Sequence, residues 1–171
     1  MQELWIPLLL TAIPLYVANA SAVVFGGKTP VDFNRTWGDG KPILGKGKTW
    51  KGFGMGVLIG TFTGGIILHY FPTQALATSP EYLLFSFLLS AGALVGDMAG
   101  SFIKRRMGMQ RGQAAHFLDQ LDFVVGGLVL SLLAGPPYWV TVFLVLIMIT
   151  PFLHMAFNRL AYLLGLKSVP W

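Results

Sequence analysis

Five long apolar blocks, separated by polar segments, are the feature that most constrains the fold of this 171-residue chain. Each block holds about 18 residues or more with few charges, the length that a helix needs to cross a bilayer. The blocks cover residues 4–25, 52–71, 82–102, 118–134 and 138–155. We therefore predict an all-α fold: a polytopic membrane helix bundle of about five transmembrane helices, forming a single domain over residues 1–171.

Composition supports a membrane location. Only 11% of the residues are charged, whereas a soluble domain of this size has about 25%, so much of the surface must face something other than water. The chain has no cysteine, which excludes a disulfide framework, a thiolate zinc site and a cysteine nucleophile.

The basic residues predict the orientation of the bundle. All twelve lysines and arginines fall in the segments 26–51 and 103–117 or in the C-terminal tail, and the loops 72–81 and 135–137 contain none. By the positive-inside rule we expect both basic segments and the C-terminus to be cytoplasmic and the N-terminus to lie outside the cell membrane. The net charge of +5 is then an orientation signal that also favours anionic lipid, and nucleic acid is not expected as a partner.

Two glycine ladders run through the second and third apolar blocks, at Gly52, Gly56, Gly60 and Gly64 and at Gly92, Gly96 and Gly100. A spacing of four places the glycines on one helix face, where they let neighbouring backbones approach closely. The ladders therefore predict helix packing, either within the bundle or between subunits of a homo-oligomer.

Three acids lie at the expected cytoplasmic boundary of the bundle. Asp97 is inside the third block, and Asp119 and Asp122 open the fourth, three residues apart and so on one helix face. Intramembrane carboxylates are costly and usually functional. If the three converge, their repulsion calls for a divalent cation or a basic partner, and magnesium suits carboxylates combined with phosphate oxygens.

Basic residues accompany these acids. Lys104 shares a helix face with Asp97, and Arg105 and Arg106 follow at once. Such a run is commonly an orientation signal alone, but beside an acid cluster it also suits a metal-bridged polyanion, because arginine and lysine bind phosphate oxygens.

The segment 45–52 is rich in glycine and lysine and includes Lys46, Lys48, Thr49 and Trp50. Its amides and lysines suit a phosphate, and Trp50 offers a face on which a base can stack. It is not a P-loop, because Gly47 stands where serine or threonine is required and no strand precedes it. A flexible, lipid-facing loop is an equally good interpretation.

Four further residues are weaker candidates. Asn19 follows Pro14 in the first block, where it would line a polar cavity or bond the backbone that the proline frees. Asp32 and Asp39 are expected in an exposed turn. His116 precedes Asp119 by one turn and is placed to hold that carboxylate.

The series Gly96-Asp97, Ser101-x-x-Lys104-Arg105 and Asp119-x-x-Asp122 resembles the signature of CTP:phosphatidate cytidylyltransferases. The resemblance to their archaeal branch, the CDP-archaeol synthases, is closer and covers nearly the whole chain. The motifs that carry it are Pro14-x-Tyr16-x-x-Asn19, Pro30-x-Asp32, the loop from Asp39-Gly40 to Gly52, and Asp119-Gln120-Leu121-Asp122-Phe123. The stretch from Arg111 to His116 departs from the bacterial pattern, so the roles of those two residues stay open.

The resemblance implies a magnesium-dependent reaction in which CTP and an isoprenoid diether glycerol phosphate give a CDP-activated lipid and pyrophosphate. Asp97, Asp119 and Asp122 would then hold one or two magnesium ions, while Lys104, Arg105 and Arg106 neutralise the pyrophosphate. The remaining candidates would close over the nucleotide from the cytoplasm: Lys46, Lys48, Thr49 and Trp50, with Asn19 and Asp32 as second choices. The alternative function is a small transporter or channel in which intramembrane acids relay cations.

Overall fold

The computed structural model describes residues 2–70, 79–110, 113–135, 139–163 and 165. They form five long helices, α1 (Gln2–Val24), α2 (Trp50–Tyr70), α3 (Ser79–Arg106), α4 (His116–Ser131) and α5 (Trp139–Leu163), with a short 3₁₀ helix, η1 (Leu132–Ala134), after α4. All five are long and apolar enough to cross a membrane, and the described residues contain no strand. The predicted all-α bundle is confirmed.

Two helices extend further than the apolar blocks predicted. α3 continues to Arg106, so Lys104, Arg105 and Arg106 form its last turn and do not belong to the following loop. Basic side chains are favourable there because they face the negative end of the helix dipole. α5 continues to Leu163, beyond the predicted end at residue 155.

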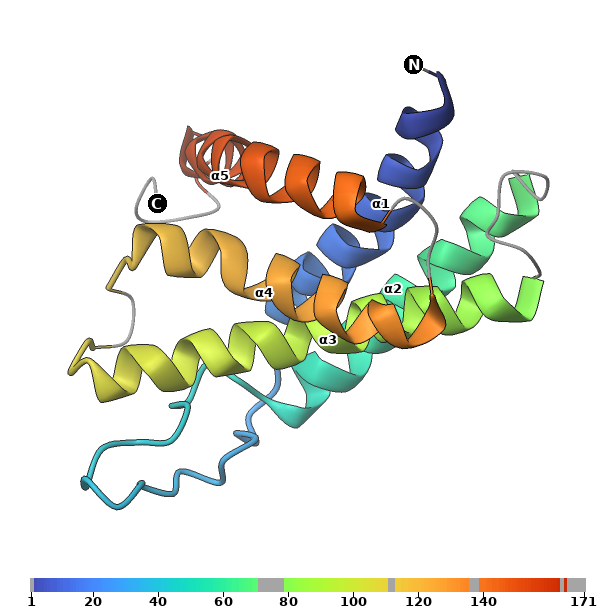
Figure 1. Ribbon diagram of the computed structural model, residues 1–171. Coiled ribbons are helices and arrows are strands. Elements are labelled where there is room, and N and C mark those ends of the chain that lie inside the picture. The colour runs from blue at the N-terminus through green and yellow to red at the C-terminus, as the bar shows by residue number, and fades with distance from the viewer. Residues whose placement is uncertain (1, 71–78, 111–112, 136–138, 164, 166–171) are drawn as a thin grey trace.

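Helix α3 lies at the centre of the bundle (Figure 1), with α4 running along one side of it and α1 and α2 crossing it. The buried core joins α1, α3, α4 and α5 through side chains such as Leu15, Phe85, Phe123 and Leu146. The loop 25–49 lies together with residues 107–110 and 113–115 at one end of α3. We call this the loop end of the bundle.

Both glycine ladders serve packing within the bundle. A Cβ placed on Gly60 would meet Ala18 of α1 and Ser90 of α3, so the first ladder seats α2 against both helices. A Cβ on Gly96 would lie 2.9 Å from the Cα of Gly126 of α4. The second ladder therefore brings the backbones of α3 and α4 into direct contact, which is the role predicted for small residues at this spacing.

Two hydrogen bonds of tyrosine hydroxyls join neighbouring helices. Pro14 leaves the carbonyl of Leu10 without its usual backbone donor, and the hydroxyl of Tyr82 on α3 donates to that carbonyl at 3.1 Å. The predicted compensation by Asn19 is therefore not the one found. Tyr16 and Thr150 share a hydrogen bond of 2.7 Å that ties α1 to α5.

Candidate active site

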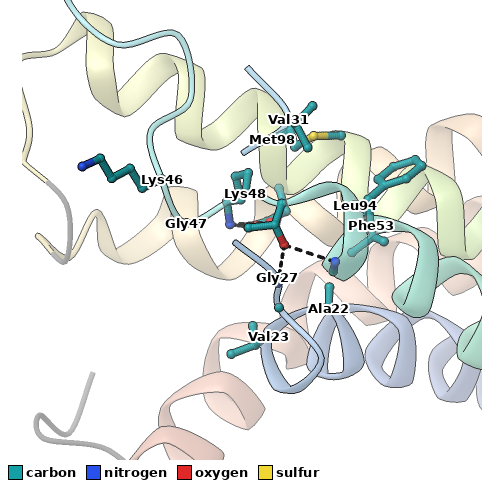
Figure 2. Close-up of a pocket in the computed structure, with 14 residues that line it drawn as sticks. Ala22, Val23, Gly27, Val31, Lys46, Gly47, Lys48, Phe53, Leu94 and Met98 are labelled. Atoms are coloured by element: carbon teal, nitrogen blue, oxygen red, sulfur yellow. Dashed lines mark hydrogen bonds and ion pairs between the residues drawn. The ribbon is translucent and has the colours of Figure 1, made fainter. Parts of the chain in front are cut away.

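A cavity of about 260 Å³ opens at the loop end between α1, α2 and α3 (Figure 2). The loop 25–49 forms one wall, and α3 contributes Leu94, Asp97 and Met98 at helical spacing. The other lining residues are Ala22, Val23, Gly26, Gly27, Val31, Lys46, Gly47, Lys48, Thr49, Gly52 and Phe53. Two lysines predicted from the loop, Lys46 and Lys48, therefore border the same cavity as the acid Asp97.

Lys48 and Asp97 form the central ion pair of this cavity. The ammonium nitrogen of Lys48 lies 2.6 Å and 2.5 Å from the two carboxylate oxygens of Asp97. Both side chains are about one-quarter exposed, so the pair is accessible from the cavity. In Figure 2 Lys48 points in among the cavity residues, whereas the exposed side chain of Lys46 extends away from them.

Asp122 reaches the same region from α4. Its carboxylate lies in a notch on α3 that exists because Gly100 has no side chain, since a Cβ on Gly100 would lie 2.8 Å from the Cγ of Asp122. Gly100 is three residues from Asp97 and so on the same face of α3. Asp122 is within electrostatic range of Asp97, Lys48 and Asp119, and within the described residues it makes no ion pair of its own.

Asp119 is held at the start of α4. It forms an ion pair with Lys104 and accepts a hydrogen bond of 2.8 Å from the backbone amide of Ala115. Lys104, predicted to sit above Asp97, therefore contacts Asp119, and Lys48 occupies its expected place beside Asp97. The partners differ because the loop 25–49 folds back over α3.

Two of the three predicted acids, and not all three, are arranged in a way that suits a magnesium ion. Among the described side chains no group of three acids or histidines is gathered around one point, so a ready-made cage of Asp97, Asp119 and Asp122 is not found there. Asp122 lies in the notch at Gly100 and within electrostatic range of Asp97, so these two acids fit the usual magnesium pattern of one or two carboxylates completed by phosphate oxygens and water.

Thr49 lines the cavity, whereas its neighbour Trp50 does not. The hydroxyl of buried Thr49 accepts hydrogen bonds from the amides of Gly27 at 2.9 Å and Gly52 at 3.1 Å, so it caps α2 and ties the end of α1 to it. Trp50 is 49% exposed and packs beside Phe33 and Phe53, outside the lining of the cavity. Trp50 is thus separated from the cavity lining by Phe53, which belongs to it.

Asp32 is buried, 8% exposed, and the predicted exposed turn is wrong for it. Its Oδ2 accepts hydrogen bonds of 2.9 Å from the amides of Leu44 and Gly45, and its Oδ1 accepts one of 3.0 Å from Asn34. Burial acts to raise the pKa of Asp32, but these amides outweigh it, and the pKa lies below its ordinary value. The loop 25–49 is thus organised around a carboxylate and is not a loose lipid-facing segment.

Replacing Asp32 with Asn should destabilise the protein by about 1–3 kcal/mol at pH 7, because an amide cannot accept all three hydrogen bonds. A carboxylate whose folded pKa is depressed stabilises above its unfolded pKa, about 3.9, and loses that contribution as the pH falls through the folded value. The Tm difference between native protein and variant in detergent should therefore be full at pH 7 and shrink below about pH 4. A difference that is constant with pH would contradict this role.

The three remaining predicted residues lie around the cavity at different depths. Asn19 is half-buried on α1, one turn before Ala22 of the cavity, and is not part of its lining. Arg105 lines a second cavity of about 330 Å³ together with Lys46 and Asp32, so Lys46 belongs to both cavities. Arg106 binds the loop 25–49. Arg111 lies outside the described residues, as does the side chain of His116.

The cavity also contains residues that the sequence did not single out, among them Gly27 and Met98. Gly27 approaches α2 closely, since a Cβ there would lie 2.7 Å from the Cβ of Lys51. Met98 follows Asp97 directly, and Leu94 is one turn before it. Asp97 and Met98 are three and four residues after Leu94, a helical spacing that was a signal available in the sequence.

Fold and site together define a multi-pass membrane protein with a charged cavity at the end of its helices. A family model described as CarS-like, CDP-archaeol synthase, matches residues 1–171. The CDP-archaeol synthase of Thermococcus kodakarensis is 47% identical over 165 residues, covering 93% of this chain and 92% of the relative. That of Methanocaldococcus jannaschii is 43% identical over 166 residues, covering 93% of each chain.

A solved structure, described as an intramembrane enzyme for archaeal membrane lipid biosynthesis, has the same fold. It superposes with a TM-score of 0.75 at 37% sequence identity, covering 88% of this chain and 91% of that one. The chain therefore belongs to the CDP-archaeol synthase family, and the resemblance predicted from its motifs is confirmed.

Proposed function

We propose that the cavity containing Lys48 and Asp97 is the place where this family's reaction occurs in the present chain. The protein is a membrane nucleotidyltransferase that forms a CDP-activated diether lipid and pyrophosphate from CTP and an isoprenoid glycerol phosphate. The observation that carries the location is the meeting of a loop lysine with an intramembrane acid, with Asp122 held beside them in the notch at Gly100.

The chemistry needs no protein nucleophile. An oxygen of the lipid phosphate attacks the α-phosphorus of CTP, a new P–O bond forms, and the bond from the α-phosphorus to the bridging oxygen breaks. Both electrons of that bond leave with pyrophosphate. Catalysis then consists of positioning the two phosphates and stabilising the charge that develops on the leaving group.

Lys48 is proposed to exchange Asp97 for the triphosphate when the nucleotide enters. In the resting site Asp97 neutralises the ammonium group of Lys48, so the cavity holds a positive charge that is not left unpaired. Lys46 and Arg105, which share the second cavity, are placed to receive the outer phosphates. Lys104 is proposed to act through Asp119, whose position it holds.

Magnesium, held by Asp97 and Asp122, would supply charge neutralisation between the phosphate oxygens. The protein's own part is to hold Asp122 of α4 in the notch at Gly100 of α3, three residues from Asp97. Asp119 extends the negative field from one turn away on α4.

The loop end is proposed to face the cytoplasm of a cell membrane. This orientation rests on the basic residues of the loop 25–49 and of the last turn of α3, which the positive-inside rule places on that side. CTP would then enter from the cytosol, while the lipid phosphate reaches the cavity along the same interface and its isoprenoid chains remain in the bilayer.

Purified protein in detergent should release pyrophosphate only when magnesium, CTP and a diether glycerol phosphate are all present. Each nucleoside triphosphate is tested in turn, and EDTA should abolish release. Release without the lipid, or with every nucleotide equally, would contradict the proposed reaction. Absence of release by a folded sample, together with cation flux in liposomes, would support the transporter alternative.

A further inference from the structure

Arg106, at the end of α3, is built into a clasp with the tip of the loop 25–49. Its guanidinium group donates to Oδ1 of Asp39 at 2.6 Å and to the carbonyl oxygens of Lys41 at 3.2 Å and Pro42 at 2.5 Å. Lys41 returns a hydrogen bond of 3.1 Å from its ammonium group to the carbonyl of Arg106. The loop tip is therefore held to α3 by four polar contacts centred on one arginine.

Aromatic rings complete the clasp. The guanidinium carbon of Arg106 lies 5.0 Å from the ring centroid of Phe102, and Trp37 packs edge-on against the same ring at 5.4 Å. Such stacking orients a guanidinium group as well as holding it. Both terminal nitrogens of Arg106 are thus occupied by loop oxygens, and its side chain is only 21% exposed, which leaves it poorly placed to grip a phosphate.

A continuous set of hydrogen bonds leads from the clasp to the wall of the cavity. After Pro42, the amide of Ile43 donates a hydrogen bond to the carbonyl of Arg35. The amides of Leu44 and Gly45 donate to the carboxylate of Asp32. The carbonyl of Lys48 then accepts from Val31 at 2.8 Å. Lys46 and Lys48 stand at the end of this chain, so their place in the cavity depends on how the loop tip is held.

We infer that Arg106 is a positioning residue for the nucleotide: by clasping the loop tip it holds Lys46 and Lys48 over the cavity, and it does not itself contact the phosphates. The inference rests on the proposed function of the cavity. It replaces the sequence-based role of Arg106 as a pyrophosphate ligand, because both terminal nitrogens are already bonded to Asp39, Lys41 and Pro42 and the remaining nitrogen, Nε, is buried.

The test compares Arg106→Gln with Asp39→Asn in the pyrophosphate assay. Arg106→Gln should raise the KM for CTP about tenfold, because the loop tip is then no longer held and Lys46 and Lys48 lose part of their fixed position over the cavity; a tenfold change corresponds to about 1.4 kcal/mol. The KM for the lipid phosphate should change less than about twofold, since the loop tip is not on its route from the bilayer. Asp39→Asn should also raise the KM for CTP, by about threefold, as one contact of the clasp is weakened.

The Asp39→Asn variant makes the experiment decisive. A positioning role of Arg106 predicts that this variant raises the KM for CTP, whereas direct phosphate binding does not. If Arg106 bound phosphate directly, removing the neighbouring negative charge would lower the KM for CTP or leave it unchanged. That result, with active native protein, would overturn the inference. Inactive native protein would instead overturn the proposed function.

Arg35→Ala is the matched control. Arg35 is an exposed arginine of the same loop that contributes only its backbone groups to the described contacts, so its removal changes the net charge equally and should leave both KM values unchanged. A rise in the KM for CTP equal to that of Arg106→Gln would show a general charge effect and contradict the clasp. Should Arg106→Gln fail to fold, as judged by its elution profile, exposed Asp39 carries the test alone.

Discussion

Replacing Asp122 with Asn is expected to lower kcat about 100- to 1000-fold, the size seen when one charge-stabilising group is removed from an active site. Asn has nearly the shape of Asp, so the notch at Gly100 stays filled and the contact between α3 and α4 is retained. The substitution removes only the negative charge beside Asp97. Asp119→Asn should also lower kcat strongly, and in addition it loses the ion pair with Lys104.

The measurement is pyrophosphate release at saturating CTP and lipid, repeated over a range of magnesium concentrations. If the carboxylates hold the metal, the remaining activity of Asp122→Asn should need more magnesium than that of the native protein. Glu81→Gln, the same chemical change at the opposite end of α3, is the control and should be fully active. Native activity of Asp122→Asn would refute the assignment of the metal to Asp97 and Asp122.

The second large effect, a loss of stability, is expected from Gly96→Val. A Cβ on Gly96 would overlap the carbonyl oxygen of Asp122 and lie 2.9 Å from the Cα of Gly126, so it would meet backbone atoms that have no rotamer to change. Overpacking commonly lowers the free energy of unfolding by about 1–3 kcal/mol. We expect the loss here to be at least at the upper end of that range, because α3 and α4 must move apart. We expect Tm to fall by about 10 °C.

Activity should be lost together with stability, because separating α3 from α4 also withdraws Asp122 from its place near Asp97. The matched control is Gly54→Val on α2, where a Cβ would meet nothing within 4 Å and the residue is exposed. Its Tm, followed by fluorescence or aggregation in detergent, should stay close to that of the native protein. An equal fall in both variants would mean that valine itself, and not the lost backbone contact, is responsible.

The sequence alone determined the architecture of this protein. A helix is the structure that satisfies the backbone of a single apolar segment in lipid, so five apolar blocks sufficed to predict five helices. The glycine ladders likewise predicted close packing, because a spacing of four places small residues on one face of any helix. The motifs from Asp97 to Asp122 indicated the family for a comparable reason: their order and spacing can be read without knowing the fold.

Only the tertiary structure decided how the charged residues pair. Lys48 and Asp97 are 49 residues apart in the sequence, and Arg106 and Asp39 are 67 residues apart. Helical spacing relates only residues within a few positions of one another, so it could not predict either pair. Asp32 was expected to be exposed because it lies in a polar loop, but burial depends on how that loop folds back on itself and on α3. Long, flexible basic side chains can serve several nearby acids equally well, and the packing of α3 against α4 and the loop determines which acid each one reaches.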